Sequence, residues 1–201
     1  MKPRKKQPVQ TRQAILDAAD AEFSLHGYCG TGIGGIVIRA ELTKGALFHH
    51  FPDKRALAVA WIGERLGAGI EQDWIAPLEG AVSLDALRDL CRLRGKDLRA
   101  DDATSALVAV AAETAARDEP LAEALEGVFG AWRGALAGFF ERGKAAGWLY
   151  PAIHPEAEAV MFVSAFSGFT VAMKTSRNPQ ARQLFLTAFE GYLETLRGQQ
   201  G

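Results

Sequence analysis

The chain has 201 residues, of which 48% are hydrophobic, and a formal net charge of -1. This apolar content is ample for a buried core and excludes an intrinsically disordered chain. The small net charge hides an uneven distribution, since residues 1–65 contain ten Lys and Arg against six Asp and Glu, whereas residues 66–201 contain thirteen against eighteen. Excess positive charge at the N-terminal end is what phosphate neutralisation by a nucleic-acid-binding protein requires.

The two cysteines, Cys29 and Cys91, are far apart and lack zinc-ligand spacing, so we expect no metal, no disulfide and a reducing cytoplasm. Either thiol could act as an oxidation sensor, but neither has an activating base beside it in the sequence. The basic N-terminus has no apolar segment after it, so we expect no secretory signal. Catalytic motifs such as a nucleophile elbow or a phosphate-binding glycine loop are missing, and we expect neither enzymatic activity nor a cofactor.

The chain begins with a basic arm over residues 1–10, which is either a solvated tail or a contact to DNA phosphates or the minor groove. A helix is predicted from Thr11 to His26, with Gly27 as its stop. Residues 31–54 then predict two short helices joined by a tight turn, a helix-turn-helix. Its inward residues are Ile33, Ile36 and Val37 on the first helix and Ala46, Leu47 and Phe51 on the second.

Helical periodicity continues to the end of the chain. Asp53 caps a longer helix that ends near Pro77, and further helices are predicted over 83–98, 104–116, 118–146, 155–174 and 179–197. The last two begin at His154-Pro155 and Asn178-Pro179, with proline in the first helical position. The fold class is therefore all-α, with about nine helices. The uncharged apolar run over 159–173 is short of the roughly 20 residues that span a bilayer, which predicts a buried or interface helix.

The helices at about 155–174 and 179–197 are apolar over more of their circumference than one partner helix can cover. A purely internal core is the simpler alternative. We favour a homodimer in which these two helices meet their copies in a four-helix interface.

Residues 11–66 resemble the DNA-binding domain of TetR-family transcriptional repressors, through the segments T-R-Q-A-I-L-D-A-A-D-A-E-F-S-L-H-G-Y and T-K-G-A-L-F-H-H-F-P-D-K-R-A-L. The resemblance implies a DNA-binding domain over residues 1–52 and a helical effector-binding and dimerisation domain over residues 53–201. It also implies that double-stranded operator DNA and a small-molecule effector are the partners.

Carried over residue by residue, the resemblance places at the DNA a set on or beside the second motif helix: Thr43, Lys44, Gly45, Ala46, Phe48, His49 and Lys54. Thr43 also suits the N-cap of this helix. Lys44 can donate to guanine O6 and N7, whereas His49 and Lys54 are expected at phosphates. Phe48 occupies the position where the family usually has tyrosine, so the hydroxyl group that would donate to a phosphate is missing. His50 could either contact DNA or pack in the core.

The first motif helix departs further from the family. Gly32, Gly34 and Gly35 replace a capping residue and polar residues, which leaves Thr31 as an alternative cap and costs about 1 kcal/mol per interior glycine. Val37 replaces a typical alanine. Glu41 replaces a typical glycine in the turn, where a left-handed conformation would strain it.

Family resemblance also implies a ligand cavity among the central helices. Candidate lining residues are the large apolar side chains Cys91, Leu107, Phe129, Trp132, Met161 and Phe166, each of which could equally be ordinary core packing. Glu113 and Thr114 are the polar candidates. We therefore expect a repressor released from its operator by a mostly apolar effector. The alternative is a helical small-molecule-binding or protein-interaction dimer with a degraded helix-turn-helix.

Overall fold

The computed structural model describes residues 8–96 and 102–198, and helices account for most of them. The helices are α1 (Pro8–Gly30), α2 (Ile33–Arg39), α3 (Lys44–His50), α4 (Lys54–Trp61), α5 (Gly67–Ile70), α6 (Ala76–Glu79), α7 (Leu84–Lys96), α8 (Ala103–Thr114), α9 (Glu119–Ala145), α10 (Pro155–Thr175) and α11 (Ala181–Thr195). Two π-helical turns, Ile62–Leu66 and Glu71–Ile75, join α4, α5 and α6 into one continuous helix over 54–79. The predicted all-α fold is confirmed, and nine separate helices lie within the described ranges.

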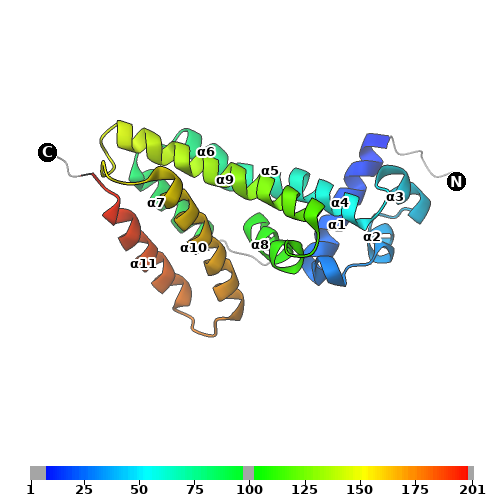
Figure 1. The fold of residues 1–201 in the computed structure, drawn as a ribbon. Coiled ribbons are helices and arrows are strands. Elements are labelled where there is room, and N and C mark those ends of the chain that lie inside the picture. Colours follow the sequence, from blue (N-terminus) through cyan, green and yellow to red (C-terminus); the bar gives the residue numbers. More distant parts are fainter. Residues whose placement is uncertain (1–7, 97–101, 199–201) are drawn as a thin grey trace.

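The molecule is elongated, and its two ends have different architectures (Figure 1). Helices α1, α2 and α3 form a compact group at one end. The helix over 54–79 and α9 run alongside each other through the middle, while α10 and α11 form a hairpin at the other end. Helix α8 packs against both α1 and α10, and it therefore connects the two ends.

Several helix boundaries differ from the predicted ones. Helix α1 begins at Pro8, and Gly27, the predicted stop, bends the helix at a φ of 71° before the helix continues to Gly30. The helix over 54–79 passes Pro77, because the π turn just before it replaces regular α-helical bonding where proline has no N–H to donate. Of the basic arm predicted over 1–10, residues 1–7 lie outside the described residues, as does Leu98, and residues 8–10 belong to α1.

The start of α11 is a second correction. Pro179 was predicted as its first residue, but the helix begins at Ala181 with Gln180 as the N-cap. The Asn178 side chain does cap backbone, since its Oδ1 accepts from Gln180 N at 2.9 Å. That bond closes a turn in front of the helix instead of the first turn of the helix itself.

Helix α10 is longer than the uncharged run that predicted it. At 21 residues it is long and apolar enough to cross a membrane by length and composition alone, with 33% of its most apolar window buried within this chain. Core helices pass the same test. Because Phe162, Phe166 and Phe169 are buried against neighbouring helices, we interpret α10 as a core helix.

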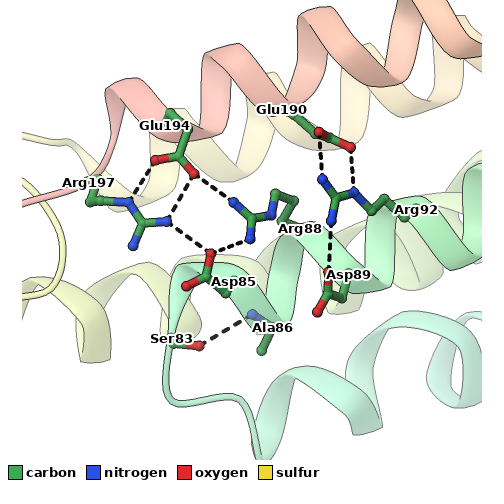
Figure 2. Close-up of polar contacts among 9 residues, drawn as sticks. All are labelled: Ser83, Asp85, Ala86, Arg88, Asp89, Arg92, Glu190, Glu194 and Arg197. Atoms are coloured by element: carbon green, nitrogen blue, oxygen red, sulfur yellow. Dashed lines mark hydrogen bonds and ion pairs between the residues drawn. The ribbon is translucent and has the colours of Figure 1, made fainter.

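Charged side chains fasten α11 to α7 (Figure 2). Arg88 pairs with Asp85 at 2.7 Å and with Glu194 at 3.0 Å, and Arg197 pairs with the same two carboxylates. One helical turn away, the Arg92 guanidinium donates to both oxygens of Glu190 at 2.7 and 2.9 Å. The hydrogen bond from Arg92 holds the pKa of Glu190 below its usual 4.5, and Arg197 lowers the pKa of Glu194 in the same way.

These shifts predict a pH-dependent contribution to stability. A carboxyl group whose pKa is lower in the folded state stabilises the fold above its unfolded pKa of about 4.5, and this stabilisation is lost as pH falls through the lower folded value. Glu190→Gln should therefore lower the unfolding temperature at neutral pH by about 1–3 °C, a small effect because the pair is partly exposed. Thermal unfolding by circular dichroism, with exposed Glu141→Gln as the control, measures it. An undiminished difference well below pH 4.5 would contradict this assignment.

Candidate nucleic-acid interface and domain junction

Helices α2 and α3 form the predicted helix-turn-helix and pack on α1. Ile36 and Leu47 are fully buried, Val37 is 7% exposed, and Phe51 closes the motif at 4% exposure. Ile33 and Ala46 are half-buried at its edge. The predicted inward faces of both helices are therefore confirmed.

Two of the three caps in this region follow the sequence signals. Thr43 Oγ1 accepts from Ala46 N at 3.2 Å at the start of α3, and Asp53 Oδ1 accepts from Ala56 N at 2.7 Å at the start of α4. Helix α2 has Gly32 as its N-cap, without a side-chain hydrogen bond. The alternative cap was wrong, because the Thr31 hydroxyl donates to the Gly27 and Glu22 carbonyls and ties the loop to α1.

Most of the residues predicted at DNA lie on one accessible side of α3. Thr43, Lys44, Gly45 and His49 are exposed. Phe48 is 45% exposed, which is unusual for phenylalanine, and Ala46 is half-buried beneath them. His50 is half-buried with its ring 5.4 Å from that of His49. The face combines one ammonium, one imidazole and one exposed ring with a backbone that Gly45 leaves uncovered.

Lys54 is placed differently from the other predicted residues. It is the first residue of the helix over 54–79, and its Nζ lies 4.3 Å from the centroid of the Tyr28 ring. This is a cation–π contact between the helix over 54–79 and the end of α1. In the described conformation Lys54 therefore joins two helices of the fold.

The sequence interpretation missed two residues on α2. Ile38 is 79% exposed on the helix that precedes the turn. Arg39 is also exposed, and its Nε donates to Glu22 at 2.7 Å. Three consecutive β-branched residues, Ile36, Val37 and Ile38, cannot all face inward on one helix, and that was the available signal for an exposed Ile38.

The turn between α2 and α3 has a strained backbone. Glu41 has a φ of 55°, and no other non-glycine residue in the described ranges has a positive φ. The strain expected from the replacement of glycine at this position is therefore present. A left-handed residue with a Cβ costs roughly 1–2 kcal/mol relative to the right-handed conformation.

A carboxylate from α8 joins the bend in α1. Glu113 Oε2 accepts from Cys29 N at 2.7 Å, just past the bend. Its Oε1 lies where a side chain at position 27 would be, since a Cβ on Gly27 would come within 2.5 Å of it. Position 27 favours glycine because of its φ of +71°, and a side chain there would also displace the Glu113 carboxylate.

Ion pairs complete the junction between the two ends of the molecule. Arg55, in the first turn of α4, donates to Asp118 at 2.8 Å, and Asp118 is the N-cap of α9. Arg12 on α1 pairs with Glu64 on the helix over 54–79, with NH1 2.6 Å from Oε2. These contacts fix the helix over 54–79 to both α9 and α1.

The centre of the helical domain is filled by aromatic side chains. The ring of Trp74 lies 5.0 Å from that of Trp132 and 4.6 Å from that of Phe166. Trp74 Nε1 donates to Thr104 Oγ1 at 3.1 Å. Among residues 8–96 and 102–198, Trp132 Nε1 is buried without a hydrogen-bond acceptor, and a buried donor that makes no hydrogen bond costs about 1–3 kcal/mol.

The six predicted lining residues differ widely in exposure. Cys91, Leu107, Trp132 and Phe166 are at most 1% exposed, and Phe129 is half-buried. Met161 lies on the surface of α10 at 46% exposure, so its predicted place in an internal cavity is wrong for a single chain. Three cavities lie within the described residues. One is formed by α1 with α8, one by the helix over 54–79 with α9, and one by α1 with the α2–α3 turn. None of these three cavities is lined by any of the six residues. Burial raises the pKa of the Cys91 thiol, which opposes the thiolate form that a sensor needs.

Two family models match this chain over the segments just described. Residues 15–61 match the model of bacterial regulatory proteins of the tetR family, and residues 104–189 match the model of the tetracyclin repressor-like C-terminal domain. The chain belongs to the TetR family. The first match covers the helix-turn-helix, and the second covers α8 to α10 and part of α11.

Individual proteins are similar to this chain in sequence or in fold. The A-factor receptor protein of Streptomyces griseus is 30% identical over 167 residues, which cover 80% of this chain and 54% of the receptor, so the chain spans about half the length of that relative. A TetR regulator structure from Chloroflexus aurantiacus has a TM-score of 0.83 at 21% identity and covers 96% and 98% of the two chains. A structure solved for the molecular basis for control of antibiotic production by bacterial hormones has a TM-score of 0.75 at 27% identity, covering 94% and 99%.

The strained turn gives a testable prediction. Glu41→Gly restores the residue that TetR-family members commonly have there and should stabilise the chain by about 1 kcal/mol, because glycine adopts a positive φ without steric cost. Glu41→Gln, which removes the charge and keeps the Cβ, should leave the free energy of unfolding nearly unchanged. Chemical denaturation of both variants measures this. Equal stabilisation by the two substitutions would show that charge, and not backbone conformation, is the source.

Proposed function

We propose that this chain is a DNA-binding transcriptional repressor that acts as a homodimer in the cytoplasm and releases its operator when a mostly apolar small molecule binds. The observation that carries the proposal is α3, a short helix capped by Thr43 that presents Lys44, Phe48 and His49 on an accessible face of a helix-turn-helix. The chain's family is one of regulatory proteins, and we propose no catalytic activity.

At the DNA, we assign base recognition to Lys44 and phosphate contact to His49. Lys44 is the first residue of α3, and the end of the helix that enters a major groove first is its N-terminus. Gly45 and Ala46 leave room for close approach, and the Phe48 ring packs against sugar and backbone. Lys54 joins this surface if it exchanges its contact with the Tyr28 ring for a phosphate.

For dimerisation, we propose the outer faces of α10 and α11. Their exposed apolar residues are Val160 at 52%, Met161 at 46%, Val171 at 50% and Leu184 at 57%. Beneath them, a stack of rings makes the hairpin rigid: Phe169 and Phe185 lie 3.9 Å apart and nearly parallel, and Phe189 continues the stack. In this arrangement Met161 belongs to the subunit interface and not to a ligand cavity.

For the effector site, we propose the aromatic centre of the helical domain, between Trp74, Trp132 and Phe166. An effector there would displace packed rings and give the buried Trp132 N–H the acceptor that it lacks. An apolar molecule with one carbonyl oxygen fits that requirement. The relationship to a protein named as the A-factor receptor supports a ligand-responsive role for this domain.

Signal transfer would then cross the junction. We propose a division near residue 52, with residues 1–52 reading DNA and residues 53–201 sensing and dimerising. Helix α8 touches the central rings through Thr104 and the end of α1 through Glu113. The helix over 54–79 contributes Trp74 to the central rings and touches the end of α1 through Lys54. A shift of either helix would change the separation of the two α3 helices, which must reach grooves roughly 34 Å apart.

Lys44→Ala tests the DNA-binding role. On the best sequence selected from a random pool, it should weaken binding by roughly 1–3 kcal/mol and relax the preference at one base pair, because it removes a direct base contact. Lys96→Ala, an exposed lysine on α7, is the charge-matched control and should change little. Fluorescence anisotropy with matched and mismatched duplexes measures both. Equal loss on all sequences would indicate the alternative, a helix-turn-helix that no longer reads sequence.

Val171→Glu tests the interface. A carboxylate buried between two apolar helix faces should dissociate the dimer at micromolar concentration, because an unpaired buried charge costs several kcal/mol. Val82→Glu is the control, since Val82 is 80% exposed and lies between α6 and α7. Light scattering gives the mass of each. A monomeric parent chain, or a Val171→Glu dimer, would refute this interface.

A further inference from the structure

The junction between α1 and α8 contains a cavity of about 290 Å³ that is separate from the proposed effector site. Helix α1 contributes Phe23 and Tyr28, the helix over 54–79 contributes Trp61, and small apolar residues of α8 line another side. The rings of Phe23 and Trp61 lie 4.9 Å apart, and those of Phe23 and Tyr28 lie 5.7 Å apart. The cavity is thus lined by two almost fully buried rings, Phe23 and Trp61, and by the half-buried ring of Tyr28, and its volume is large enough for a small organic molecule.

The charge in this cavity comes from Glu113. Its carboxylate is half-buried and accepts one hydrogen bond from Cys29 N, and within the described residues it has no ion pair. Two basic side chains also line the cavity, but His26 lies nearest to Glu22, at 3.9 Å, and Lys174 is exposed near the end of α10. The cavity thus holds a carboxylate that has capacity for a further donor.

Aromatic faces and a carboxylate together are the chemistry that binds organic cations. The fold already uses this attraction at the same junction, since the Lys54 ammonium lies over the Tyr28 ring. We propose that this cavity binds a small aromatic cation, such as an amine or amidine, with Glu113 as its counter-ion and the rings of Phe23, Tyr28 and Trp61 around its apolar part. Lys174 opposes such a ligand through its like charge.

A ligand in this cavity would touch Gly27 and Glu113, the two residues that interlock α1 with α8. It would therefore act on operator affinity directly at the junction, a consequence that rests on the proposed function. Binding itself does not depend on DNA, so the two can fail separately.

Benzamidinium and benzamide are suitable probes, because they have nearly the same shape and differ in charge. Calorimetric titration of the full chain should show saturable binding of benzamidinium and at least about tenfold weaker binding of benzamide. Glu113→Gln keeps an oxygen for Cys29 N and should reduce benzamidinium affinity by about tenfold, whereas Lys174→Ala should raise it by about threefold. Exposed Glu123→Gln is the matched control and should leave affinity unchanged.

Opposite effects at Glu113 and Lys174 distinguish an electrostatic site from a change in folding, and unfolding temperatures of the variants report on the fold. If Glu113→Gln does not fold, the Lys174 variant and the two probes still decide the question. Equal affinity for both probes, unchanged affinity in Lys174→Ala, or no saturable benzamidinium binding at millimolar concentration would overturn the proposal. Benzamidinium binding without any change in operator affinity would leave the site intact and refute only its link to DNA.

Discussion

The fit between Gly27 and the Glu113 carboxylate is the constraint on which the arrangement of the two domains depends. Glycine at position 27 allows α1 to bend at a positive φ, and the bend turns the Cys29 amide toward α8. Glu113 then occupies the space that a Cβ would fill. This hydrogen bond acts together with the ion pairs of Arg12 and Arg55 to hold the DNA-binding end and the helical domain in one orientation.

Around this contact, each domain uses a different kind of interaction. The helix-turn-helix is held by small aliphatic packing and by caps, which suits a module that must expose most of α3. The helical domain is held by large rings in its centre and by charged pairs at its edge, where α7 meets α11 (Figure 2). In the proposed mechanism, movement in the ring cluster would reach α1 through α8 and the helix over 54–79, because both helices contact α1.

Local features of the fold were predictable from the sequence, and long-range ones were not. Thr43 and Asp53 cap their helices through amides three residues away, so their role is visible in a short segment. The strain at Glu41 followed from the replacement of a turn glycine. The hydrogen bond between Glu113 and Cys29 joins residues 84 positions apart in the sequence. The alanine-rich sequence around Glu113 does not indicate that this carboxylate contacts α1.

Subunit interfaces and cavities are also difficult to predict from the sequence. Helical periodicity identifies Met161 and Val171 as apolar positions but does not distinguish a core from a subunit surface. The sequence also does not show where a cavity lies. The predicted lining residues are packed or exposed, whereas the residues that line the cavity between α1 and α8 have the sequence pattern of ordinary core and surface residues. Lys54, expected at a phosphate, instead contacts a ring that approaches it only through the bend in α1.

Selection of bound sequences from a random duplex pool at physiological salt tests the central claim, a dimer that reads DNA through two copies of α3. The account predicts a palindrome whose half-sites are separated by about one helical turn, roughly 34 Å, or a multiple of it. Recovery of no motif by a folded dimer, or of a motif without two-fold symmetry, would contradict it.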